Sequence, residues 1–276
     1  MITAAIAGVE GVGGYVTNSM ALMTDAVHML TDVSAIGLSL LALWFGTRPA
    51  NSRKTYGYYR LEILSALANG VLLLAVTAWL VVEALHRLSA PEPVVLGTMV
   101  KVAGFGLGAN LLSLYFLHRS HSMNVRAAFL HILGDALSSF GVIVAGGLMF
   151  WRAHWLWLDP AVSLLISIVI VIGAFRLLRD AVDILLEAVP AHVDMPQVRQ
   201  LMGKVQGVVA VHDLHVWTIS SGIYALSAHL VVADPMVCNN DLILSAVKHE
   251  LFERYGIDHT TIQIESETFS HLGEVH

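Results

Sequence analysis

Long apolar runs constrain this chain more than any other feature of its sequence. Each run has roughly 20 residues, which is long enough to cross the hydrocarbon core of a bilayer as a helix. Across the whole chain 56% of residues are hydrophobic and 13% are charged, whereas soluble domains are about 25% charged. We therefore predict a bundle of six transmembrane helices, at residues 1–17, 20–46, 61–88, 95–118, 124–151 and 159–186. The first run lacks a charged leading segment, so it is read as a helix and not as a signal peptide.

The character of the chain changes near residue 190, where an ordinary soluble composition begins. We therefore predict two domains, a transmembrane domain at 1–189 and a soluble domain at 190–276. The hydrophobic pattern of the second domain predicts an α-β-β-α-β order, with a small sheet that has its helices on one face, as in a ferredoxin-like α+β domain. The expected elements are a helix at 196–205, strands at 208–219 and 223–233, a helix at 241–255 and a strand at 260–265.

Positively charged loops predict the orientation in the membrane, because Lys and Arg accumulate on the cytoplasmic side. The loops after the second and fourth runs carry most of these residues, so both termini and the soluble domain are expected in the cytoplasm. The single cysteine, Cys238, forms no intrachain disulfide, and the net charge of −6 does not suggest nucleic acid as a partner. The residues compared are Arg48, Arg53, Lys54, Arg60, Arg119 and Arg126 on one side, and Arg87, Lys101 and Arg152 on the other.

Two short stretches inside apolar runs each pair a histidine with an aspartate four residues later. His28 and Asp32 lie in the second run, and His131 and Asp135 lie in the fifth. Positions i and i+4 share one face of a helix, so each stretch presents an imidazole beside a carboxylate. Two such helices facing each other would form a site with two nitrogen and two oxygen ligands. That ligand set suits Zn²⁺, and Co²⁺ can use it too.

The charges of these four residues indicate what the site exchanges. An Asp at the centre of a membrane helix costs roughly 2.5–3.5 kcal/mol on insertion scales, so two of them need compensation. Two neutral histidines and two aspartates carry −2, and one divalent cation neutralises them. Without metal, the same groups are expected to take up protons instead, because histidine titrates near neutral pH. The sequence therefore predicts exchange of metal for protons.

Other polar and small residues in the apolar runs have less certain roles. Asp25 precedes His28 by three residues and either orients its imidazole or simply begins the helix. Glu10 lies in the first run without an evident partner, and it either belongs to a proton or water path or hydrogen-bonds to the second helix. Gly104 and Gly108 form a small-xxx-small pair, which predicts close helix packing.

Other interpretations of the His-Asp pairs fit the sequence less well. One His-Asp pair could satisfy itself inside the bundle, but two pairs of identical spacing favour a shared ligand. A membrane metalloenzyme would need an open coordination position and a motif such as His-Glu-x-x-His, which the sequence lacks. A membrane metal sensor would not need four ligands deep in the bilayer. We therefore predict a transporter and not an enzyme.

Four motifs are spread along the chain: TNSMALMTDAVHMLTD at 17–32, YGYYRLE at 56–62, HILGD at 131–135 and VHDLHVW at 211–217. Together they resemble the cation diffusion facilitator family, in particular its bacterial cobalt–zinc–cadmium branch. The resemblance implies a homodimer with six membrane helices, a cytoplasmic metallochaperone-like domain, and efflux of Zn²⁺, or of Co²⁺ and Cd²⁺, in exchange for protons. It also implies a bacterial inner-membrane location, because residues 118–121 replace the long histidine-rich loop of many eukaryotic members.

The resemblance assigns roles to individual residues. It implies that His28, Asp32, His131 and Asp135 bind the transported metal, and that Arg60 and Glu187 form a charge interlock. In the soluble domain it implies a regulatory Zn²⁺ site at His215, His229 and Glu265, with a further ligand from His271 or His276. A hairpin at residues 220–222 would place His215 opposite Ser227 and diagonal to His229. From spacing alone, solvated histidines remain an alternative, and His212, His249 and His259 are weaker candidates.

Overall fold

The computed structural model describes residues 2–117, 123–152, 154–233 and 240–267. These residues form two compact units. One contains residues 1–41 and 65–178, and the other contains residues 42–64 and 179–276. The side chains of Arg119 and Arg126, together with Cys238, His271 and His276, lie outside the described residues, so the structure does not bear on the predictions made for them.

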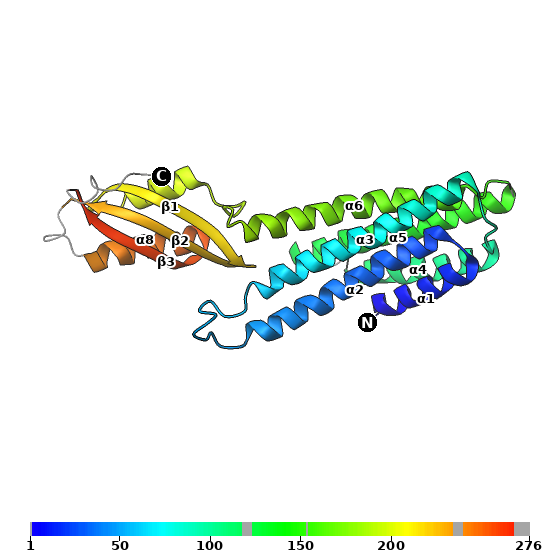
Figure 1. Cartoon of the computed structure of the whole chain (residues 1–276), viewed down its shortest axis with the longest axis horizontal. Coiled ribbons are helices and arrows are strands. Elements are labelled where there is room, and N and C mark those ends of the chain that lie inside the picture. The colour runs from blue at the N-terminus through cyan, green and yellow to red at the C-terminus, as the bar shows by residue number, and fades with distance from the viewer. Residues whose placement is uncertain (1, 118–122, 153, 234–239, 268–276) are drawn as a thin grey trace. The chain divides into compact units, whose positions relative to one another are not determined.

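Each predicted apolar run forms one helix (Figure 1). Within the described residues, five of the helices are long and apolar enough to cross a membrane. The first has 16 residues and measures about 24 Å at 1.5 Å per residue, which is shorter than the hydrocarbon core of about 30 Å. Five membrane-crossing helices thus agree with the prediction, and a sixth crossing stays a prediction. The helices are α1 Ile2–Thr17, α2 Met20–Gly46, α3 Leu61–Ser89, α4 Leu96–Leu117, α5 Met123–Trp151 and α6 Leu158–Leu185.

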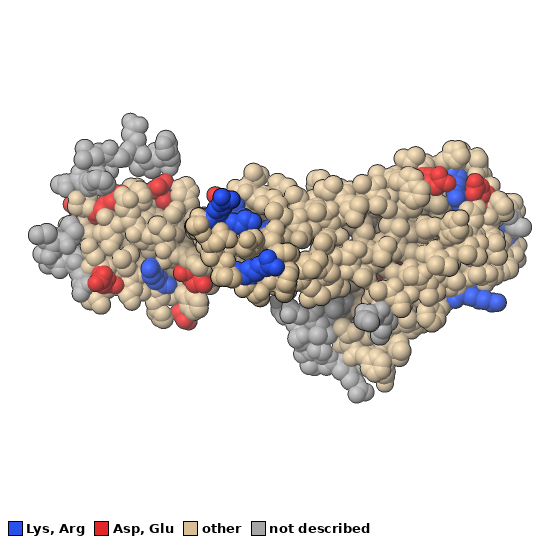
Figure 2. All heavy atoms as spheres, turned by 60° about the horizontal axis from the view of Figure 1, so that its bottom comes forward, with Lys and Arg blue, Asp and Glu red and all other residues tan. Residues whose placement is uncertain are grey.

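The outer surface of these helices is apolar. Figure 2 shows a wide band of the helical surface, on the face in view, without Lys, Arg, Asp or Glu. Large apolar side chains such as Leu40, Trp79, Phe116 and Ile168 are exposed along the helices. Lipid chains can cover such a surface, whereas its exposure to water would be unfavourable in free energy. The protein is therefore an integral membrane protein.

Some of the buried polar groups inside the bundle are paired between α2 and α6. Asp159, in the first turn of α6, accepts hydrogen bonds from the Ser19 hydroxyl at 2.5 Å and the Met20 amide at 2.6 Å. It thereby satisfies amide groups that the start of α2 leaves without helical partners. One turn further, the hydroxyls of Thr24 and Ser163 are 2.6 Å apart. These bonds hold the beginning of α2 against α6.

The close packing predicted for Gly104 and Gly108 is wrong for the described residues, because a Cβ at either position would meet no atom within 4 Å. The buried face of α4 is instead formed by residues spaced at the helical period, including Gly106 and Asn110. A Cβ at Gly106 would lie 1.9 Å from Oε1 of Glu10. Gly106 lies between the two predicted glycines in the sequence, and it is the one that allows the close approach of α1 and α4.

The soluble domain has the predicted α-β-β-α-β order (Figure 1). Strand β2 is central, antiparallel to β1 and parallel to β3, with α8 as the connection between β2 and β3. Apolar residues of both helices pack with those of the strands in one core, so the helices cover one face of the sheet as predicted. The elements are α7 Met195–Gly203, β1 Val208–Ser220, β2 Ile223–Val232, α8 Asn240–Tyr255 and β3 Ile257–Ser266.

Candidate metal centres

Four side chains from α2 and α5 converge inside the bundle. Nε2 of His131 lies 3.3 Å from Oδ2 of Asp32 and 3.9 Å from Oδ2 of Asp135. His28 lies 3.8 Å from each aspartate, through Nδ1 to Asp32 and through Nε2 to Asp135. The two imidazole centroids are 6.1 Å apart. The structure therefore brings together all four residues that the sequence singled out.

These separations suit a common cation better than hydrogen bonds. Ligands about 2.0–2.1 Å from a tetrahedral Zn²⁺ lie about 3.3–3.4 Å from one another. The four nitrogen–oxygen distances, from 3.3 to 3.9 Å, begin at this value and need only small side-chain shifts to reach it. Nδ1 of His28 and Oδ2 of Asp32 are also buried without a hydrogen-bond partner. Buried polar atoms without partners are costly, and a bound cation would satisfy them.

The ligands differ in how accessible they are. The side chain of Asp135 is 4% exposed, whereas that of His131 is 48% exposed. Asp135 is thus the more enclosed of these two side chains and His131 the more exposed.

Two other sets of predicted residues have contacts that the structure describes. Asp25 is buried and accepts hydrogen bonds from Ser138 at 2.7 Å and from Ser139 at 3.2 Å, both on α5. Among the described hydrogen bonds, none joins it to His28. Nη2 of Arg60 lies 2.9 Å from Oε1 of Glu187, so the charge pair forms. Both side chains are largely exposed, and such pairs contribute about 0–1 kcal/mol.

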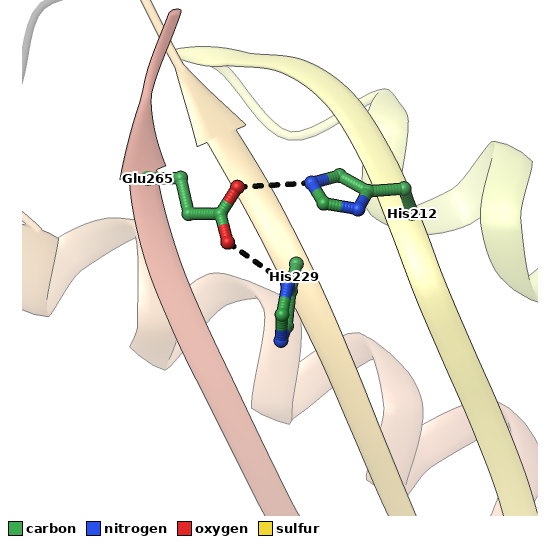
Figure 3. A group of neighbouring side chains, drawn as sticks. All are labelled: His212, His229 and Glu265. Atoms are coloured by element: carbon green, nitrogen blue, oxygen red, sulfur yellow. Dashed lines mark hydrogen bonds and ion pairs between the residues drawn. The ribbon is translucent and has the colours of Figure 1, made fainter. Parts of the chain in front are cut away.

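A second group of ligands lies on the sheet (Figure 3). Oε1 of Glu265 lies 2.8 Å from Nδ1 of His229, and Oε2 lies 3.0 Å from Nε2 of His212. The amide of Gln263 also donates to Oε1 at 2.7 Å. The three strands each contribute one residue, and one ligand atom from each lies within 4.8 Å of the others. The group is partly buried and supplies three ligands of a type that Zn²⁺ accepts.

Residue His215 is not in this group, and His212 takes the place expected for it. The predicted register holds at the hairpin, since His215 pairs with Ser227. Between His212 and His215 the register shifts, with three steps on β1 against two on β2, and Asp213 has a φ of 48°. Such a β-bulge re-aims side chains locally, and it places His212 directly opposite His229.

The bulge also gives His215 a different neighbour. Its Nε2 lies 3.0 Å from Oδ1 of Asp213, and Nε2 of His229 lies 3.6 Å from Oδ2 of the same carboxylate. The hydrogen bond with His215 is the main reason that the pKa of Asp213 lies below its ordinary value. The sequence contained the signal for His212, since it is one of two histidines in VHDLHVW, but spacing could not choose between them. His249 and His259 join no comparable group among the described residues.

The fold is an apolar helical bundle with two histidines and two aspartates gathered inside it and an attached α+β domain, which is the architecture of a membrane transporter. Residues 1–186 match the model of the cation efflux transmembrane domain, and residues 190–267 match that of the cation efflux protein cytoplasmic domain. The chain belongs to the cation efflux family, also called the cation diffusion facilitators. Its function class is therefore metal cation efflux, and it is not an enzyme.

Similar proteins cover nearly the whole chain. The zinc transporter ZitB of Escherichia coli is 40% identical over 268 residues, 96% of this chain and 84% of ZitB. The metal cation efflux system protein CzcD of Cupriavidus metallidurans is 40% identical over 258 residues, 93% of this chain and 81% of CzcD. The cadmium, cobalt and zinc/H⁺-K⁺ antiporter of Bacillus subtilis is 36% identical over 268 residues, 95% of this chain and 86% of that protein.

A solved structure of the metal-bound C-terminal domain of the CzcD transporter from C. metallidurans is 36% identical to the matched part of this chain. It covers 26% of this chain and 99% of its own, with a TM-score of 0.25.

Proposed function

We propose that this protein exports Zn²⁺ from the cytoplasm in exchange for protons, and that Co²⁺ and Cd²⁺ are further substrates. His28, Asp32, His131 and Asp135 bind the transported ion. The observation that carries this proposal is the convergence of the four side chains at 3.3–3.9 Å. The names of similar proteins, a zinc transporter and a proton antiporter, support the choice of ions.

The exchange follows from the charges of the four ligands. With metal bound, two neutral imidazoles, two carboxylates and one divalent ion sum to zero. After release, the carboxylates and imidazoles lie close together in a poorly hydrated bundle, so uptake of protons replaces the lost charge. Metal and protons therefore compete for the same atoms, and a proton gradient can drive metal release on the far side.

The proposed architecture has six membrane-crossing helices at 1–189 and a regulatory domain at 190–276. The protein lies in a bacterial inner membrane, with the regulatory domain and the N-terminus on the cytoplasmic side. The match to the cation efflux cytoplasmic domain supports a homodimer. His212, His229 and Glu265 form the regulatory Zn²⁺ site, with His215 as an outer neighbour. Metal bound there would stabilise the form of the domain that binds it. Asp25 supports the α2–α5 contact, and Arg60 with Glu187 acts as the charge interlock.

The experiment that tests transport uses purified protein in liposomes with an imposed pH gradient. We expect Zn²⁺ uptake that increases with the gradient in the unmodified protein. Asp135→Asn keeps the side-chain size but removes a ligand charge, so we expect uptake to fall by at least tenfold. Asp183→Asn, an exposed change at the end of α6, serves as the matched control and should leave uptake unchanged. Uptake that ignores the pH gradient would refute proton exchange, and full uptake by Asp135→Asn would refute the site.

A further inference from the structure

Two carboxyl groups outside the metal ligands face each other inside the bundle. Glu10 on α1 and Asp25 on α2 are both completely buried. Neither oxygen of Glu10 has a hydrogen-bond donor among the described residues. Helices α1 and α2 meet at this level, since a Cβ at Gly11 would lie 3.7 Å from Cβ of Ala26, and the two carboxyl groups are close enough to interact. The structure therefore contains a close carboxyl pair that the transport site does not use.

The backbone of α4 provides the space for this pair. A Cβ at Gly106 would lie 1.9 Å from Oε1 of Glu10, so the carboxyl group occupies the volume that any other residue would fill. On the other side, Ser138 and Ser139 donate hydrogen bonds to the two oxygens of Asp25. Glu10 is thus held against α4, and Asp25 is held against α5.

Within the described residues, acidic groups dominate the surroundings of the pair, and His28 is the one protonatable side chain that opposes them. Glu10 is influenced electrostatically by Asp25 and Asp135, and Asp25 by Asp135 and His28. No Lys or Arg is among these neighbours in the described part of the chain. Two facing carboxylates in a water-poor interior repel each other strongly, and one shared proton both removes a charge and supplies the missing hydrogen bond. The pair is therefore built to hold a proton.

We propose that the Glu10–Asp25 pair binds one of the protons that are exchanged for metal. This inference rests on the proposed function and assigns a proton site separate from the four metal ligands. When a divalent cation neutralises Asp135, the repulsion on the pair falls, and the shared proton leaves to water. When the metal departs, the proton returns. Because linkage is reciprocal, the proton on the pair weakens metal binding by the same factor.

The test counts protons released as Zn²⁺ binds to the purified full-length protein, by titration calorimetry in buffers of different ionisation enthalpy at one pH. Glu10→Gln replaces the shared proton with an amide hydrogen that can donate to Asp25 permanently. We expect this variant to release about one proton fewer for each zinc that binds at the membrane site, and to show a correspondingly shallower dependence of log Kd on pH at that site. Glu83→Gln, a change on α3 beside Arg87, should match the unmodified protein.

Each outcome of the proton count supports or overturns the shared-proton site. An unchanged proton count and pH slope in Glu10→Gln would overturn the proposal, and so would the loss of one bound zinc instead of one proton. If Glu10→Gln does not fold, Asp25→Asn removes the same shared proton and is judged by the same count. Unmodified protein that binds zinc with proton release but does not transport it would refute the proposed function. The proton site would still be judged by the number of protons that Glu10→Gln releases.

Discussion

Gly106→Ala tests the packing that holds the carboxyl pair. The added Cβ would lie 1.9 Å from Oε1 and 3.1 Å from Cδ of Glu10, and 3.6 Å from Cγ2 of Ile6. Glu10 must therefore retreat by more than about 1 Å to restore ordinary contact, within an interior that is already close-packed. Overpacking of this kind costs about 1–3 kcal/mol, and the better helix propensity of Ala returns about 1 kcal/mol of that cost.

We therefore expect a small loss of stability with a large change in proton release. Thermal unfolding in detergent should shift down by only a few degrees, whereas calorimetric proton release per zinc should fall by about one, as in Glu10→Gln. Gly104→Ala is the matched control on the same helix, because its added Cβ would have no atom within 4 Å, and both readouts should stay unchanged. Normal proton release by Gly106→Ala, in folded protein, would refute the link between this contact and the proton site.

Two further predictions concern other parts of the chain. His212→Ala should lower zinc binding by the soluble domain as much as His229→Ala, and His215→Ala should lower it less, because only His212 and His229 contact Glu265. Metal analysis of the full-length protein with the membrane site disabled checks this. A larger loss in His215→Ala than in His212→Ala would contradict the observed register. Asp159→Asn should lower the free energy of unfolding by about 1–3 kcal/mol, because an amide donor would then face the Met20 amide. A thermal unfolding midpoint equal to that of the Asp183→Asn control would show that this cap contributes nothing.

Local patterns in the sequence predicted most of the fold. The helix bounds in the bundle agree with the apolar runs to within a residue or two, because hydropathy and helix period depend only on neighbouring residues. The α-β-β-α-β order of the soluble domain was recognisable for the same reason. The third strand was predicted too short, and it begins at Ile257 directly after Gly256, whose φ of 66° ends α8. The first residues of β3 do not alternate between apolar and polar, so the sequence pattern did not indicate a strand there.

The sequence by itself singled out the four residues that converge in the bundle, since His and Asp at i and i+4 must share a helix face. Only the tertiary structure decided that α2 and α5 bring those faces to the same depth. It also decided that a bulge at Asp213 selects His212, and that Gly106, and not Gly104 or Gly108, makes the close contact with Glu10. These outcomes depend on the register between elements distant in sequence, and packing sets that register whereas local composition does not.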